Sequence, residues 1–268
     1  MNFDRIYSIE VSPNFLIEEL RIKFQAKKTL TTNGNFCAID IFNLSDLERN
    51  AISSEKYATL TLKVGYADDV GLLELGKGDI TSVTHEATTT DIITTIHCKD
   101  GFKSLTDNYI QLSFAENTLT SKIITSIVEK IGLPLKFSNI TPQPIKNGYS
   151  FVGTVSEALN DLAFQYGFTW SIQNKELQIL KNDTSTKINV FLLSEQTGLI
   201  QNPSRIIENK SEKSRYFATC LLNPRLQAGD LISLKSTSLS GTFIIHEVTH
   251  VGDTEAIEWY TKIILGET

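Results

Sequence analysis

The sequence lacks the long hydrophobic run that a membrane helix needs. Thr, Ser or Lys interrupts its longest apolar segments within a few positions, so none approaches the roughly 20 apolar residues that span a bilayer. The start of the chain, Met1 to Arg5, contains neither a basic nor an apolar segment, which argues against a secretory signal peptide. We therefore expect a protein that folds in a cytoplasm and does not itself insert into a membrane.

Cysteine and clustered basic residues are also scarce. Cys37, Cys98 and Cys220 are odd in number, far apart and surrounded by apolar residues, and no CxxC pair is present. We expect all three to be small buried side chains in a reducing compartment. The net charge is −6, and Lys27-Lys28 is only a doublet. Because tight binding to nucleic acid needs a basic patch, this composition argues against nucleic acid as a tightly held ligand.

Two glycine-rich segments look like functional motifs but are incomplete. Gly71–Gly78 fits GxxxxGK, yet a phosphate loop needs Ser or Thr after the Lys and then a helix. Here Gly78 and a strand-like segment follow, which predicts a glycine-rich hairpin between two strands. Gly148–Gly153 has one residue too many for the GxSxG elbow of α/β-hydrolases, and we predict a turn there.

Histidines and paired acids do not form a recognisable site either. His246 and His250 lie four apart on a predicted strand, which separates them by roughly 13 Å and is too far for one metal ion. Adjacent acids such as Asp68-Asp69 and Glu18-Glu19 point apart, so they suit acid–base chemistry poorly. The sequence therefore predicts no catalytic residue, no metal and no cofactor.

What the chain does contain is a faint copy of itself. Residues 76–101 and 241–266 align without a gap at an offset of 165, with eight of 26 columns identical. Unrelated sequences match in roughly one or two columns. The repeat predicts a duplicated β-unit interrupted by an insertion, in which the shared histidine has a structural role. The positions that define it are Gly76, Ile80, Val83, Thr84, His85 and Ile92, matched by Gly241, Ile245, Val248, Thr249, His250 and Ile257.

Both ends of the chain have the pattern of antiparallel β-structure. Apolar and polar residues alternate over Leu20–Gln25, and an Asn33-Gly34 turn leads to the next strand. Before residue 105, further strands are expected at 36–42, 57–66, 80–83 and 91–98. After residue 182, they are expected at 216–221, 230–234, 242–249 and 256–264, with a charged loop at 209–214.

The middle of the chain changes character. Residues 119–131 have apolar side chains at helical spacing between a possible Thr118 cap and Gly132. A capping box, Thr154 with Glu157, opens a second helix that Gly167 ends. Short strands are expected at 135–137, 168–172 and 177–180. We predict an α+β, mainly β fold, with two similar antiparallel β-barrel or β-sandwich domains (1–104 and 183–268) flanking a small α/β insertion (105–182).

Three segments together resemble a known family. Asn35–Ser45 looks like the x-I-x-I-x-N-L-S segment of baseplate hub proteins from contractile-tailed phages. Asn223–Asp230 is similar to the N-P-x-L-x-P-G-D segment of that family, with Ala228 where Pro is expected. Val248–Asp253 with Trp259–Thr261 resembles its V-x-H-x-G-D…W-x-T end. The resemblance spans nearly the whole chain.

This resemblance implies a structural protein of the virion, not an enzyme. In such families each subunit of a homotrimer contributes two tube domains of similar fold, so the ring is pseudo-sixfold. The ring joins the hexameric tail tube protein to the trimeric central spike, and other baseplate proteins surround it. The chain is then a part of the tail baseplate that is assembled in the bacterial host cytoplasm. The negative net charge suits a lumen through which the genome passes without specific binding.

Two alternatives remain at this stage. The first is a hub component of a phage-derived contractile injection system, such as a type VI spike. Those spike proteins usually continue into an OB-fold and a β-helix needle, and this sequence ends at Thr268, so we expect the unfused form. The second is a tail-associated hydrolase of the cell wall, which would need an acid pair or a metal site.

Overall fold

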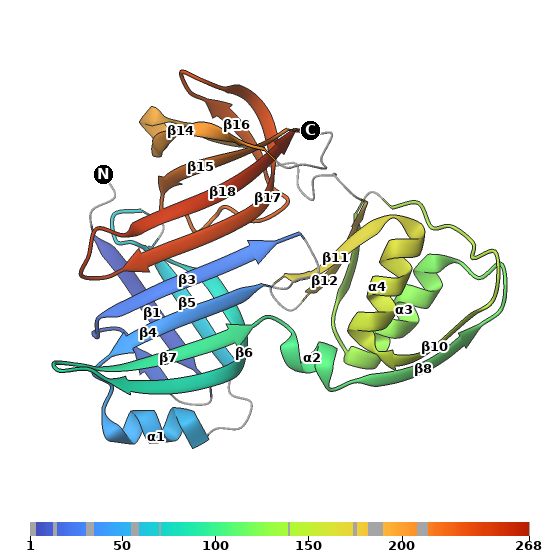
Figure 1. Cartoon of the computed structure of the whole chain (residues 1–268), viewed down its shortest axis with the longest axis horizontal. Helices are drawn as coiled ribbons and strands as arrows, with labels where there is room; N and C mark the ends of the chain where they lie inside the picture. The colour runs from blue at the N-terminus through green and yellow to red at the C-terminus, as the bar shows by residue number, and fades with distance from the viewer. Residues whose placement is uncertain are drawn as a thin grey trace.

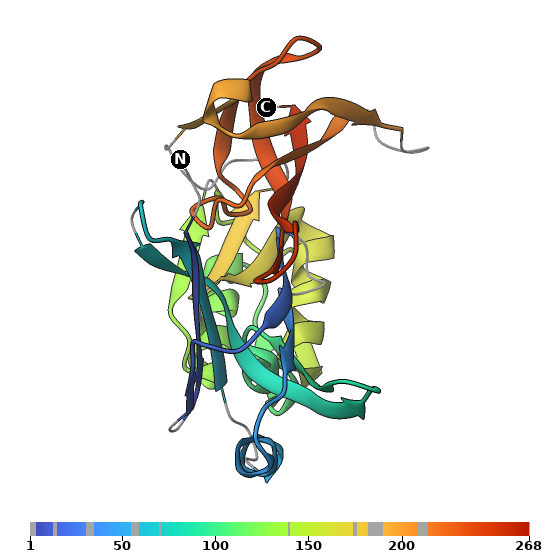
Figure 2. The same cartoon turned by 90° about the vertical axis from the view of Figure 1, so that its left-hand side faces the viewer.

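The architecture is mainly β, as the sequence predicts, and its largest element is a 13-stranded sheet. The computed structural model describes residues 4–12, 15–30, 35–54, 59–69, 71–138, 140–173, 176–181, 190–207 and 214–267. Figure 1 shows a first β-unit (β1–β7), a second β-unit above it (β13–β18) and an insertion of helices and short strands to one side. In Figure 2 the insertion lies behind the first unit. Among the described residues the large sheet does not close into a barrel.

The first β-unit runs in the order β3-β4-β7-β6-β5-β1-β2 across the sheet. Its strands form because apolar and polar residues alternate: in β3, Ile22, Phe24 and Ala26 are buried, while Lys23 and Gln25 are exposed. Its elements are β1 (Arg5–Val11), β2 (Phe15–Ile17), β3 (Ile22–Thr29), β4 (Phe36–Phe42), α1 (Asp46–Ser54), β5 (Thr59–Tyr66), β6 (Gly71–Ala87), β7 (Ile92–Lys99) and α2 (Phe102–Thr106).

The insertion packs two helices against two small sheets around a core of its own. Helix α4 begins at the predicted capping box, in which Thr154 and Glu157 bond each other's backbone N–H, and Gly167 ends it in the left-handed conformation. Its elements are β8 (Tyr109–Phe114), α3 (Thr120–Ile131), β9 (Leu135–Ser138), β10 (Tyr149–Thr154), α4 (Val155–Tyr166), β11 (Phe168–Gln173) and β12 (Glu176–Lys181).

The second β-unit repeats the strand order of the first. β14-β15-β18-β17 continue the sheet, and β16 pairs with β17 as β5 pairs with β6. A separate hydrophobic core, which includes Ile245, Val248 and Ile263, stabilises it. Its elements are β13 (Val190–Ser194), the 3-10 helix η1 (Glu195–Thr197), β14 (Leu199–Ile206), β15 (Arg215–Leu221), β16 (Leu231–Lys235), β17 (Ser240–Asp253) and β18 (Trp259–Glu267).

Several local predictions differ from the structure. Gly71–Gly78 is not a hairpin but the first half of the continuous strand β6, paired with β5. The predicted turn at 148–153 is mostly strand β10, paired with β8. Helix α3 is capped by Leu119 rather than by Thr118. Cys37, Cys98 and Cys220 are buried free thiols, as predicted. The Asn33-Gly34 turn and most of the 209–214 loop lie outside the described residues.

Candidate functional site at the junction of the two β-units

The two β-units meet along one strand, β17. The first half of β17 pairs with β16 of its own unit, and its second half pairs antiparallel with β3 of the first unit. Seven residue pairs make this second contact, from Glu247 opposite Thr29 to Asp253 opposite Lys23. An ion pair between Lys27 and Glu247, 2.8 Å from Nζ to Oε1, crosses the same strands. The large sheet is continuous because of this contact.

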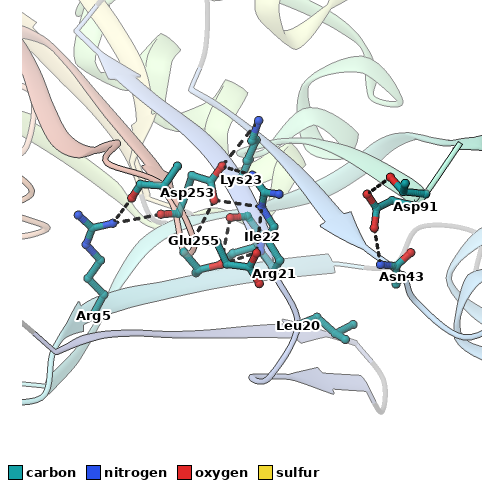
Figure 3. A network of polar contacts seen from close by, with 12 residues as sticks. Arg5, Leu20, Arg21, Ile22, Lys23, Asn43, Asp91, Asp253 and Glu255 are labelled. Atoms are coloured by element: carbon teal, nitrogen blue, oxygen red, sulfur yellow. Dashed lines mark hydrogen bonds and ion pairs between the residues drawn. The ribbon is translucent and has the colours of Figure 1, made fainter. Parts of the chain in front are cut away.

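A carboxylate at the end of β17 is the centre of the polar contacts drawn in Figure 3. The Arg21 guanidinium donates two hydrogen bonds to the Asp253 carboxylate, 2.9 Å from Nη2 to Oδ2 and 3.3 Å from Nε to Oδ1. Lys23 Nζ lies 3.6 Å from Oδ2, and the Glu255 backbone N–H donates to Oδ1. Burial alone would raise the pKa of Asp253, but the Arg21 hydrogen bond, the backbone donor and the two cations lower it below its usual range.

The turn that follows Asp253 is held by the first unit as well. Arg5 donates to the backbone oxygens of Asp253 and Ala256, at 3.2 and 2.5 Å, and its guanidinium lies 5.3 Å from the centre of the Trp259 ring. The Ile22 backbone N–H donates to Thr254 Oγ1 at 3.0 Å. The partners are more than 200 residues apart in sequence, and together they bind the β17–β18 turn to β1 and β3.

Aromatic packing completes the junction beneath these polar groups. Phe24 and Trp259 meet edge to face with their ring centres 5.3 Å apart. Gly252 lies between them, and a Cβ there would be 2.4 Å from the Phe24 ring and 2.7 Å from the Trp259 ring. Trp259 and Leu222 come from the second unit yet belong to the hydrophobic core of the first. The junction is therefore a packed interior as well as a strand pairing.

The β6–β7 and β17–β18 hairpins contain the sequence repeat and share one register. In each first strand an extra residue makes a bulge at the same offset of 165: Thr81 between Ile80 and Ser82, and His246 between Ile245 and Glu247. The Gly76 and Gly241 positions also correspond, since they pair with Leu62 of β5 and Leu234 of β16.

The shared histidines make the same contact in both hairpins. His85 Nδ1 lies 3.0 Å from Thr94 Oγ1, and His250 Nδ1 lies 2.9 Å from Thr261 Oγ1, directly across each strand pair. Thr94 and Thr261 are 167 residues apart, so the second hairpin has two more residues in its turn than the first.

The gapless alignment therefore fails beyond the turn. Ile92 and Ile257 share a column in that alignment but not a position in the fold. Ile92 begins β7, whereas the Ile257 side chain is 94% exposed in the turn before β18. Single-residue matches beyond a turn of changed length are coincidental, because the side-chain direction of a strand depends on register.

The two copies differ in what covers them. Val248, Thr249 and His250 are buried beside β3, and the His250 side chain is 1% exposed. At the matching positions Val83 is half-buried, and Thr84 and His85 are exposed. Burial, the nearby charge of Lys28 and, in the opposite sense, a hydrogen bond to the Leu226 backbone leave the pKa of His250 at about 3. His250 is thus a neutral interior group.

The other candidate motifs do not assemble into a reactive site. In the described part of the chain, no group of three or more His, Cys, Asp or Glu side chains could hold a metal ion. Glu18 and Glu19 lie before β3, while Asp69 of the first unit forms an ion pair with Arg225 of the second at 3.1 Å. No helix within the described ranges is long and apolar enough to cross a membrane. The candidate functional site is therefore the junction of the two β-units, where ion pairs, hydrogen bonds and aromatic packing come together.

Comparisons with known proteins agree with this architecture. The family model described as "Baseplate hub gp41" matches residues 6–262. A search of curated proteins found no match. Among solved structures, the 43 kDa tail protein of prophage MuSo2 from Shewanella oneidensis superposes with a TM-score of 0.73 at 10% identity, covering 98% of this chain and 96% of that one.

Two further solved structures share the fold. The tail protein from Neisseria meningitidis MC58 gives a TM-score of 0.72 at 10% identity, covering 99% and 97% of the two chains. The c3393 protein of E. coli, a type VI secretion component described as similar to the T4 tail proteins gp27 and gp5, gives 0.67 at 10% identity, covering 96% and 76%. At such identities these likenesses establish the fold alone.

Proposed function

The chain belongs to the baseplate hub gp41 family, and from this premise we propose that it is the trimeric hub that joins the hexameric tail tube to the trimeric central spike. Three chains would present six similar β-units in a ring. The face toward the tube would then have sixfold character, while the face toward the spike keeps threefold symmetry. Closed rings of identical subunits are the usual form of such assemblies.

One observation carries this proposal: the two β-units have the same strand order, and their matching hairpins have the same register. β3-β4-β7-β6-β5 corresponds to β14-β15-β18-β17-β16. Two units of one design in a single chain are what a ring needs to reconcile threefold and sixfold symmetry. Under this proposal residues 1–104 and 183–268 are the two tube domains, 105–182 is the insertion, and the repeat positions before the turns, Gly76–His85 and Gly241–His250, maintain the tube fold.

The same proposal names the partners and the place of action. The tail tube protein, the central spike protein and other baseplate proteins would contact the ring, and the genome would pass through its lumen. The net charge of −6 supports a lumen that repels DNA. The hub would be assembled in the host cytoplasm and act in the tail baseplate of the virion. It would act by holding its neighbours in place, with no catalysis.

Imaging of the assembled particle tests the proposal directly. We expect a ring at this protein's position with threefold symmetry and six similar densities. Light scattering on the purified chain is the complementary measurement. A chain that stays monomeric at high concentration and also beside a spike protein would overturn the trimeric hub. A cell-wall hydrolysis activity abolished by a single carboxylate substitution would overturn the structural role.

A further inference from the structure

The contact between the two units within one chain is a template for a contact between chains. β17 uses the edge of Glu247–Asp253 to pair with β3. By the hairpin correspondence, the same edge in the first unit is the outer half of β6, Ser82–Ala87. By the strand order, the match of β3 in the second unit is β14. In a ring of alternating first and second units, each chain supplies one such contact internally and must make the other with a neighbour.

Both matching edges lack a strand partner in the described part of the chain. The outer half of β6 pairs with β7 on one side, while β5 ends its pairing at Asp79. β14 is the end of the strand order, with β15 as its neighbour on one side. Figure 1 shows β14 in the upper unit and β6 in the lower unit. Unpaired edges of this kind are ready to accept another strand.

The burial of the repeat supports the same reading. Val-Thr-His is identical in both copies, buried at 248–250 where β3 covers it and more exposed at 83–85. On the other edge, Ser204 and Arg205 are exposed, and the side chain of Ile207 just beyond β14 is 88% exposed. A second copy of the chain would cover these positions as β3 covers their counterparts.

We propose that Val83–Glu86 of one subunit pairs antiparallel with Ser204–Ile207, at the end of β14, of a second copy of this chain. The template also sets the register. Thr249 lies opposite Lys27 and His250 opposite Ala26; their counterparts place Thr84 opposite Ile206 and His85 opposite Arg205. The residues of β14 that correspond to Ala26 and Lys27 of β3 follow from the pairing of β14 with β15. Arg205 lies opposite Tyr216 of β15, as Ala26 lies opposite Cys37 of β4 in the first unit.

The sequence of β14 explains where this ladder begins. Pro203 has no backbone N–H to donate, and the register of β14 against β15 is irregular between Gln201 and Ser204. Regular pairing resumes at Ser204, so Ser204, Arg205 and Ile206 of β14 and Ile207 just beyond it are available. The two edges belong to different strands of the chain, so the contact is head-to-tail, the type that forms a closed ring when the rotation between subunits closes. The inference rests on the proposed trimeric hub.

Disulfide cross-linking tests the register. The double variant T84C/I206C places two thiols on directly opposite residues, a separation that a disulfide can span. We expect mild oxidation to convert this variant into a covalent trimer on a non-reducing gel. The three native cysteines are buried and will not contribute. The matched positive control is K27C/T249C, which joins the corresponding pair inside one chain and tests whether this rung type accepts a disulfide.

The competing arrangement has its own variant. L16C/I206C probes pairing of β14 with β2, the other end of the sheet, where Leu16 is 59% exposed. Trimer formation by L16C/I206C and not by T84C/I206C would overturn the proposed seam. Light scattering under reducing conditions separates the two levels. If light scattering shows trimers and K27C/T249C forms its disulfide but T84C/I206C does not, the proposed strand pairing is overturned and the trimeric hub is not. If light scattering shows only monomers, the trimeric hub and the strand pairing are both overturned.

Discussion

The buried histidine of the second repeat makes stability depend on pH. His250 is 1% exposed, contacts Thr261 and has a pKa of about 3, whereas the unfolded chain has the ordinary value of about 6.5. Below pH 6.5 the unfolded state takes up a proton on this ring, and the folded state does not. The free energy of unfolding therefore falls as pH falls through this window and is unaffected by this group above it.

The size of the effect follows from the two pKa values. Between about pH 7.5 and 4.5, the protonation of His250 in the unfolded state alone lowers the free energy of unfolding by about 2.5 kcal/mol. Acids add little in this window. The pKa values of Asp253, Asp91 and Glu157 are lowered in the fold, so the stability that their charges contribute is lost only at lower pH.

Urea unfolding of H250Q at several pH values measures this contribution. Gln removes the titrating ring, so the variant is less stable than the parent at pH 7.5, but the difference shrinks by about 2.5 kcal/mol by pH 4.5. H85Q is the matched control, because His85 occupies the same position in the first hairpin and makes the same contact with Thr94, yet is exposed. We expect H85Q to keep the parent's pH dependence.

The result that refutes this reasoning is a difference between H250Q and the parent that stays constant from pH 7.5 to 4.5. It would mean that the ring is protonated in the fold and that burial beside β3 does not exclude its charge. A pH dependence lost equally in H85Q and H250Q would also contradict it, because exposure would then make no difference. Both measurements are made at a concentration where light scattering shows monomer, so that assembly does not contribute.

Three further predictions concern the junction and the core. G252A forces a Cβ against the rings of Phe24 and Trp259, so we expect a loss of about 3 kcal/mol in the free energy of unfolding; an unchanged midpoint in urea would show that the two units are not packed as described. D253A removes the carboxylate that accepts the Arg21 hydrogen bonds, and we expect about 2 kcal/mol of destabilisation. K23A removes a half-exposed cation whose contacts are the 3.6 Å ion pair with Asp253 and a 6.0 Å approach to the Phe42 ring, and should change little. The buried free thiols should resist a thiol reagent at pH 8 in native protein and react after unfolding, since burial raises the pKa of Cys220 to about 12; fast native labelling would contradict their burial.

Elements with their own local chemistry were predictable from the sequence. The Thr154–Glu157 capping box and Gly167 mark both ends of α4, and alternation marks β3. Glycines led to a wrong prediction where they allow two strands to approach closely instead of forming a turn. A Cβ at Gly78 would lie 2.5 Å from the Lys99 backbone, so the glycine allows β6 and β7 to approach inside a strand that the sequence alone predicts as a hairpin.

Strands β8 and β10 were missed for a related reason. Each has a buried face, with Ile110 and Tyr149 in the core of the insertion. Their outer faces carry the apolar or aromatic side chains of Tyr109 and Val152, which are 78% and 72% exposed, so the alternation that identifies a half-buried strand is weak there. β14 contains Pro203 and two irregularities in register, which hide its pattern. Its partners lie elsewhere in the chain, and a local sequence window contains no information about them.

The sequence by itself determined the repeat and the identity of the shared Val-Thr-His, because these depend on side chains within one hairpin. Only the tertiary structure decided that β3 covers the second copy and leaves the first exposed. The contact of Arg21 with Asp253 spans 232 residues and joins the two units. The physical reason is that local pattern determines which residues can pair, while chain topology determines which edges meet. Among the described residues it leaves the outer half of β6 and the far side of β14 without a strand partner.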